Sequence, residues 1–247
     1  MANILHIETS TDICSVALSR DGQIVFHQEE REGPNHAKSL APMVEQAVKT
    51  ADAQGYKLDA VAVSAGPGSY TGLRIGTSTA KGLCYGRGLK LIGIPTLELL
   101  CVPVLLGERF LELCESEPEA DILLCPMLDA RRMEVYTALY DRALRPKSEV
   151  APLVVDEQSL ASELATRKIV FFGNGAAKCK SVITHPNAIF IDHIEPIAKN
   201  MMPLAEKAFY QGRTEETAYF EPFYLKEFVA GKSKSLLPQN NSKNGVT

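Results

Sequence analysis

The sequence predicts an α/β protein whose two halves repeat one order of elements: three strands, then helix, strand, helix, strand and helix. Short extended runs precede runs with helical apolar spacing in both halves. An acidic residue also closes the first strand of each half, Glu8 and Asp129. Setting these two opposite each other aligns Ala17-Leu18 with Ala138-Leu139 without a gap, which indicates a weak internal repeat.

The first half opens with three expected strands, at residues 3–9, 14–20 and 23–30, and Asp21-Gly22 supplies a hairpin turn between the last two. Pro34-Asn35 then begins a helix that ends before Gly55, because its apolar residues recur with the helical period. A strand at 60–64, a helix to about residue 86, a strand at 91–94 and a helix from Thr96 complete this half.

The second half repeats this order with extended runs at 121–128, 134–141 and 149–155, followed by a helix at 157–165. A strand at 168–172, a turn at 173–175, a short helix, a strand at 188–191 and a long helix at 196–211 follow. We therefore expect two lobes, at residues 1–107 and 108–228. Residues 229–247 are rich in Lys, Ser and Asn, which predicts a mobile tail.

Composition indicates a compact cytoplasmic protein, since 45% of the 247 residues are apolar and no targeting or membrane-spanning segment is evident. The six cysteines form no C-x-x-C pair and are typical of reduced core residues. A formal charge of −4 argues against tRNA binding by this chain alone, because nucleic-acid affinity comes mostly from Lys and Arg.

A glycine-rich loop at residues 64–82 follows the apolar strand and leads into a helix. Gly66 and Gly68 allow unusual backbone conformations, and Ser69 or Thr71 can cap a helix whose N-terminus suits an anion. The loop is not a Walker A motif, because no Gly-Lys-Ser/Thr follows. The alternative is that small residues serve packing, since two sets recur every four residues: Gly72, Gly76 and Ala80, and Ser78, Gly82 and Gly86.

Catalytic and metal motifs are not found in the sequence. None of the five histidines is spaced as a ligand pair, and neither H-E-x-x-H nor G-x-S-x-G occurs. Glu8, Asp12, Asp129 and Glu134 lie beside expected hairpin turns, where carboxylates usually are solvated or cap backbone N–H groups. We therefore assign no catalytic residue and no metal site.

Several strings together resemble the bacterial TsaB family, also called YeaZ: GPGSYTGLRIG after IETSTDICSVAL, DARRMEVY at 129–136 and EPFYLK at 221–226. The resemblance runs from about Ile4 to Lys226. It implies a two-lobed actin-like ATPase (RNase H-like) fold made of duplicated βββαβαβα units. It also implies kinship with TsaD, the catalytic subunit with which TsaB proteins form a tRNA-modifying complex.

Kinases and ATPases of this superfamily hold nucleotide with a hairpin in each lobe and an adenosine loop, and this chain departs from them at both hairpins. Glu8-Thr9-Ser10 replaces an Asp-x-Gly-type turn, and Arg131 replaces a glycine, so both phosphate turns look altered. The sequence leaves open whether ADP or ATP binds in the cleft or at a partner interface. The candidate nucleotide or anion residues are Thr9, Ser10, Gly66, Gly68, Ser69, Thr71, Arg131, Gly173 and Gly175.

The resemblance thus implies a non-catalytic subunit that supports a TsaD-like enzyme. That complex transfers threonylcarbamoyl from its adenylate to N6 of the adenosine beside the anticodon in tRNAs that read ANN codons. A TsaE-like ATPase would be a third partner, tRNA would be met only through the complex, and the isolated chain could pair with a second copy. The candidate interface residues lie on the first-lobe helices: His36, Leu40, Met43, Ala47, Gly72, Gly76, Ala80 and Lys81.

Two alternatives from other classes remain at this stage. One is an ATPase or small-molecule kinase that uses the cleft, and the other is a metallopeptidase, since the wider family has carried a glycoprotease name.

Overall fold

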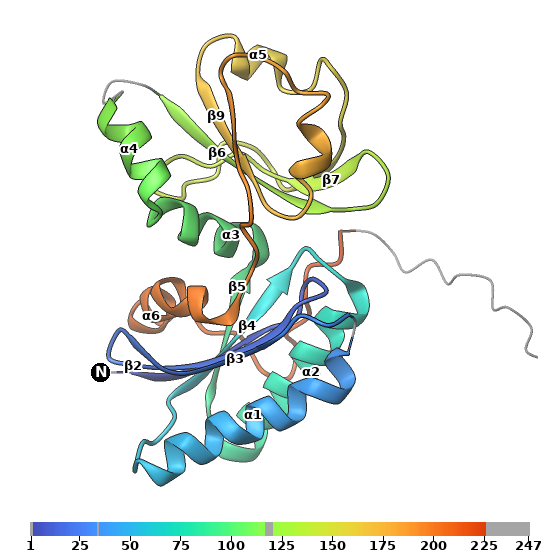
Figure 1. The fold of residues 1–247 in the computed structure, drawn as a ribbon. Helices are drawn as coiled ribbons and strands as arrows, with labels where there is room; N and C mark the ends of the chain where they lie inside the picture. Colours follow the sequence, from blue (N-terminus) through green and yellow to red (C-terminus); the bar gives the residue numbers. More distant parts are fainter. Residues whose placement is uncertain (1, 34, 117–120, 226–247) are drawn as a thin grey trace, which may run out of the picture.

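The computed structural model describes residues 2–33, 35–116 and 121–225, so the expected tail at 229–247 lies outside the described residues. Its first sheet has the order β3-β2-β1-β4-β5 and the second has the order β10-β9-β6-β7-β8. Figure 1 shows them in two lobes, one above the other. In each sheet, the first three strands in chain order pair antiparallel, and the last two pair parallel beside the first strand. The predicted duplication is therefore confirmed.

The strands of the first sheet are β1 (Asn3–Glu8), β2 (Cys14–Arg20), β3 (Gln23–Glu30), β4 (Ala60–Gly66) and β5 (Lys90–Pro95). Those of the second are β6 (Ile122–Asp129), β7 (Glu134–Thr137), β8 (Ala151–Val154), β9 (Lys168–Phe172) and β10 (Ala188–Ile191). The ungapped repeat alignment is wrong by one residue, because β1 pairs Glu8 with Ser15 whereas β6 pairs Asp129 with Val135. The second hairpin loop is one residue shorter than the first.

Helices cover both faces of the first sheet. One face packs on α1 (His36–Ala53) and α2 (Tyr70–Arg87), since Leu5 and Ile7 of β1 point to that side. Ile4 points to the opposite side, where it meets Leu99 and Ala205. That side carries α3 (Thr96–Leu105), the 3₁₀ helix η2 (Ala198–Met201) and α6 (Met202–Tyr210), as Figure 1 shows.

The second sheet is covered by α3 and α4 (Glu108–Ser116) on one face, and by α5 (Ala161–Leu164) and the 3₁₀ helix η1 (Ala177–Cys179) on the other. Leu97 and Leu100 of α3 belong to the second lobe's core, whereas Leu99 belongs to the first. α6 follows the second sheet in the chain and packs on β1 and β5 of the first. The helix α3 therefore contributes to the cores of both lobes, and α6 lies on the first lobe although it follows the second sheet in the chain. These helices, not a simple linker, join the two lobes.

Two expected helices are shorter than predicted. The run 157–165 yields only α5, because the Asp156 carboxylate accepts hydrogen bonds from Gln158 N (3.0 Å) and Ser159 Oγ (2.8 Å) and holds a turn. The run 196–211 becomes η2 followed by α6, since Pro203 lacks an N–H and suits only the first turn of an α-helix. Sequence reasoning did not separate α4 from α3.

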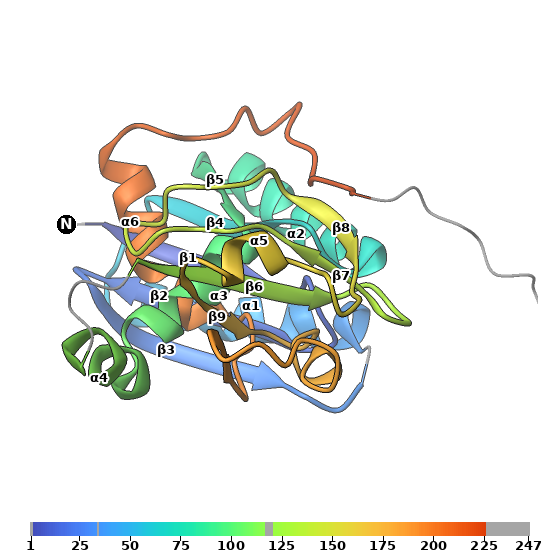
Figure 2. The ribbon, with the colours of Figure 1, turned by 90° about the horizontal axis from the view of Figure 1, so that it is seen from above.

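A segment that we call the strap, residues 211–225, returns along the β5 edge of the first sheet (Figure 2). Glu215 N donates to Leu91 O (2.8 Å) and Phe223 N donates to Ala65 O (2.7 Å). Lys81 Nζ of α2 donates to two strap carbonyls, Ala218 O (3.0 Å) and Phe220 O (3.1 Å). The strap therefore closes the sheet edge and ties it to α2.

Candidate functional site: the cleft between the lobes

A cleft of about 520 Å³ lies between the lobes, where the first hairpin of each sheet faces the start of α2. It brings together five of the predicted nucleotide or anion residues, Ser10, Gly68, Ser69, Thr71 and Arg131. The other four, Thr9, Gly66, Gly173 and Gly175, are not among the residues that line it. Strap residues Tyr224 and Leu225 complete the wall, and the Tyr224 ring lies 4.7 Å from that of Tyr70 between centroids.

In the first lobe, the glycine loop packs directly on the Glu8-Thr9-Ser10 turn. Ser69 N donates to Ser10 O (2.6 Å), and Thr9 Oγ1 donates to Gly72 O (2.8 Å). A Cβ at Gly68 or Gly72 would collide with the backbone oxygen of Ser10 or Thr9. The Ser69 side chain also caps α2 by accepting from Gly72 N (3.3 Å), as predicted. These glycines therefore serve close packing of the loop on the Glu8-Thr9-Ser10 turn.

Glu8 is fully buried beneath this loop. Its Oε1 accepts a hydrogen bond from Ser10 N (2.5 Å), and burial raises the pKa of the carboxyl to about 7. Among the described residues no ion pair joins Glu8 to Arg131. The Glu8 carboxyl is instead enclosed in its own lobe.

The equivalent turn of the second lobe is open to solvent. Asp129 Oδ1 accepts hydrogen bonds from Arg131 N (2.9 Å) and from Lys178 Nζ, while Asp129 N donates to Asn174 Oδ1 (2.9 Å). Arg131 lines the cleft with a φ of +70°, in the left-handed region that favours glycine.

Gly173 and Gly175 pack behind that turn. Gly173 has a φ of +102°, and a Cβ there would collide with Met127 O. Gly175 N donates to Met127 O (3.0 Å), and a Cβ at Gly175 would crowd Leu128 and Val135. Both glycines therefore serve the packing of this turn against the end of β6.

Most of the predicted interface residues lie inside the first lobe. Seven are buried: His36, Leu40, Met43, Ala47, Gly72, Gly76 and Ala80. A Cβ at Gly76 would collide with Thr9 Oγ1, and one at Gly72 with the backbone oxygen of Thr9, so the group packed on this small face belongs to the same chain. Lys81 is half-buried and holds the strap. A partner would therefore meet the opposite, exposed sides of α1 and α2.

We call that exposed surface the helix-pair face, and sequence reasoning missed it because helical apolar spacing marks the core side. Its members are exposed residues of two helices that pack side by side on one face of the first sheet (Figure 1). They are Ala37, Ala41, Pro42, Glu45, Gln46 and Lys49 of α1, and Thr71, Arg74, Ser78, Gly82 and Tyr85 of α2. The spacing of Ser78, Gly82 and Gly86 was the one signal that pointed to it.

Other chemistry has little support in the part of the chain that the structure describes. No group of three or more His, Cys, Asp and Glu side chains there could hold a metal ion. Across the same residues, every helix falls short of the length and apolar character that a bilayer crossing requires.

Two sheets of the same order with a cleft between them define a two-lobed protein of actin-like fold. The family model described as TsaD, tRNA N6-adenosine threonylcarbamoyltransferase, matches residues 30–233. The Escherichia coli protein called tRNA threonylcarbamoyladenosine biosynthesis protein TsaB is 31% identical, covering 93% of this chain and 96% of its own length. The protein of that name from Haemophilus influenzae is 30% identical, covering 93% and 95%.

A solved structure, YeaZ from Pseudomonas aeruginosa, superposes with a TM-score of 0.72 at 26% identity and covers 91% of this chain and 100% of that one. The chain belongs to the TsaB (YeaZ) family.

Proposed function

We propose that this chain is a non-catalytic partner subunit in the synthesis of tRNA N6-threonylcarbamoyladenosine, where it binds and supports a TsaD-like transferase. Membership of the TsaB family supports the pathway. The packing of the glycine loop on the Glu8-Thr9-Ser10 turn supports the non-catalytic role, because Gly68 and Gly72 are occupied by contacts with the chain's own backbone. The ATPase, kinase and peptidase alternatives have less support.

The helix-pair face is the proposed contact with the TsaD-like subunit. Ala41 and Ser78 have small side chains and Gly82 has none, which lets a partner helix approach closely. Tyr85 is 90% exposed, and an exposed aromatic residue is a frequent energetic centre of interfaces. The same surface would serve a symmetric self-dimer when the TsaD-like subunit is missing.

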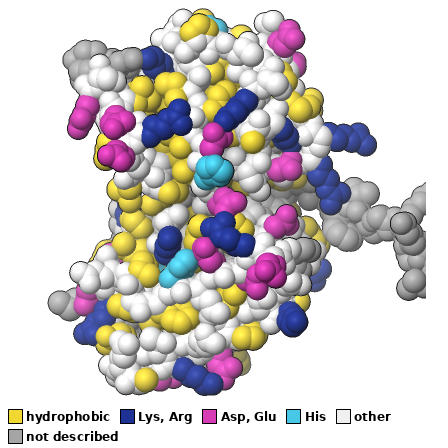
Figure 3. Space-filling view, viewed as in Figure 1, with side chains coloured by type: hydrophobic (Ala, Val, Ile, Leu, Met, Phe, Trp, Pro, Cys, Tyr) yellow, Lys and Arg dark blue, Asp and Glu magenta, His cyan; other side chains and the backbone are white. Residues whose placement is uncertain are grey.

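Contact with tRNA is proposed to occur only through the complex. The chain has a formal charge of −4, and on the face seen in Figure 3 the basic side chains lie among acidic ones. A continuous basic surface is what nucleic-acid binding requires. We further propose a TsaE-like ATPase as the third component of a cytoplasmic assembly.

Co-elution of the full chain with the TsaD-like protein of its own organism tests this proposal. We expect a stable complex with wild type and its loss with Ser78→Arg, because a long charged side chain would separate the helices. Ser162→Arg on exposed α5 is the matched control and should bind like wild type. No complex with wild type would contradict the proposed function, whereas normal binding by Ser78→Arg would contradict only the choice of surface.

A further inference from the structure

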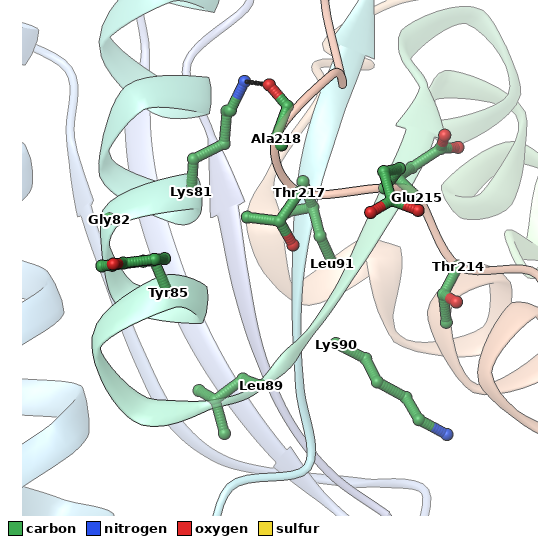
Figure 4. A pocket seen from close by; sticks show the side chains of 11 residues that line it. Lys81, Gly82, Tyr85, Leu89, Lys90, Leu91, Thr214, Glu215, Thr217 and Ala218 are labelled. Carbon is green, nitrogen blue, oxygen red and sulfur yellow. Dashed lines mark hydrogen bonds between the residues drawn. The ribbon is translucent and has the colours of Figure 1, made fainter.

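A second hollow, which we call the side groove, lies on the first lobe away from the cleft. It has a volume of about 640 Å³ and runs between α2 and the strap across the start of β5. Leu89 and Leu91 line it, Gly82 and Tyr85 belong to the α2 side, and residues 214–218 form the strap side. Figure 4 shows Lys81 reaching from α2 to Ala218 of the strap, with Tyr85 on the helix and Glu215 and Thr217 on the strap.

Two tyrosines beside the side groove are almost fully exposed: Tyr85 at 90% and Tyr219, next to lining residue Ala218, at 83%. Tyrosine is ordinarily part-buried in folded proteins, so two such rings beside one apolar hollow indicate a surface that another molecule covers. Tyrosine is also enriched among the residues that contribute most to binding.

The charged side chains around the groove indicate what kind of group that molecule would place in it. Lys81 Nζ is already engaged by Ala218 O and Phe220 O. Lys90 Nζ lies over the Phe209 ring, 4.8 Å from its centroid, and Figure 4 shows its side chain leading away from α2. Glu215 and Glu216 of the strap have no ion-pair partner among the described residues. Lys81 and Lys90 also line the groove, but neither forms an ion pair with these carboxylates. An apolar floor beside two carboxylates without an ion pair among the described residues favours a cation on a long aliphatic stem.

We propose that the side groove receives an arginine side chain of the protein that docks on the helix-pair face. This inference rests on the proposed function, and Gly82 and Tyr85 belong to both surfaces. The arginine stem would lie on Leu89 and Leu91. Its planar guanidinium would stack on the Tyr85 ring and donate hydrogen bonds to the strap carboxylates. Arginine is favoured over lysine because it is less strongly hydrated, stacks on aromatic rings and pairs with carboxylates through two N–H groups.

The test measures the affinity of the full chain for its TsaD-like partner by titration calorimetry at several salt concentrations. We expect about a tenfold weaker affinity for Tyr85→Ala, the size of effect typical of a central aromatic contact. For the double variant Glu215→Gln with Glu216→Gln we expect about a fivefold loss and a weaker dependence on salt. The matched control is Glu112→Gln with Glu115→Gln on exposed α4, which should match wild type. Circular dichroism checks that each variant is folded.

The outcomes separate the two proposals. If wild type binds its partner and both groove variants bind it with the same affinity, the result contradicts the side-groove inference and leaves the proposed function intact. Weaker self-association of these variants in sedimentation, with partner affinity unchanged, would assign the groove to a second copy and also contradict it. No binding by wild type contradicts the proposed function together with this inference.

Discussion

The first hairpin turns of the two lobes occupy the same place in the same sheet order, yet their surroundings are opposite. Glu8 closes β1 and is fully buried, whereas Asp129 closes β6 and is exposed. The difference comes from the neighbour: the glycine loop packs on the first turn, while Asn174 and Lys178 only border the second. The duplicated topology therefore places an acidic residue at the same position in both lobes, but the burial and hydrogen-bond partners of that residue differ.

The largest expected effect comes from breaking the packing on the first turn at Gly76. Gly76→Leu would drive a side chain into Thr9 Oγ1, so we expect it to lower the free energy of unfolding by about 3 kcal/mol, or to prevent folding. Thermal or urea unfolding measures this. Gly82→Leu, on the exposed side of the same helix with nothing within 4 Å, should instead be neutral or stabilising by up to about 1 kcal/mol.

A folded, fully stable Gly76→Leu variant would mean that the loop does not hold the first turn as described. The comparison between the two lobes would then lose its basis.

The second prediction concerns pH and the burial of Glu8. Its pKa is raised by burial from 4.5 to about 7, so its stabilising contribution is present below pH 4.5 and is lost as the pH rises to about 7. We expect Glu8→Gln to gain stability relative to wild type over that window, reaching about 3 kcal/mol. Urea unfolding from pH 4 to 8 measures this difference.

His6 is also buried, and burial lowers its pKa to about 3. Because His6 is present in both proteins, the difference between Glu8→Gln and wild type isolates the contribution of Glu8. The matched change in the exposed turn is Asp129→Asn, which should alter stability by no more than about 1 kcal/mol. A constant difference between Glu8→Gln and wild type from pH 4 to 8 would contradict the burial of an unpaired carboxyl.

The smallest effect is expected at the open turn. Arg131→Gly relieves a left-handed backbone, so we expect a gain of about 1 kcal/mol in the free energy of unfolding. If Arg131 obstructs the cleft, the affinity for ADP and ATP measured by calorimetry should stay unchanged or improve. A tenfold loss in the variant would identify Arg131 as a phosphate ligand and would favour the nucleotide-binding alternative.

Much of the fold follows from local signals in the sequence. Asp21-Gly22 adopts the positive φ values of a hairpin turn, and Ser69 caps α2, because both effects depend on residues close in the chain. The strap and the exchange of helices depend on contacts between distant segments, such as Phe223 N to Ala65 O. No local pattern encodes those contacts, so sequence reasoning did not find them.

The candidate surfaces illustrate the same limit. The small residues Gly72 and Gly76 indicated a close approach, but spacing alone does not say that the neighbour is Thr9 of the same chain, through its backbone at Gly72 and its side chain at Gly76. Tyr85 drew no attention in the sequence because a single aromatic residue in a helix usually is core. Its exposure became visible only in the folded lobe.

The central claim is that this chain supports catalysis without performing it, and reconstituted tRNA modification tests that most directly. The measurement is threonylcarbamoyl transfer to tRNA, together with ATP hydrolysis, by the purified chain, by its TsaD-like partner, and by both combined with the TsaE-like ATPase. We expect no appreciable turnover by the chain alone and full transfer only when it is combined with its partners. Rapid ATP hydrolysis or tRNA modification by the chain alone would contradict the account.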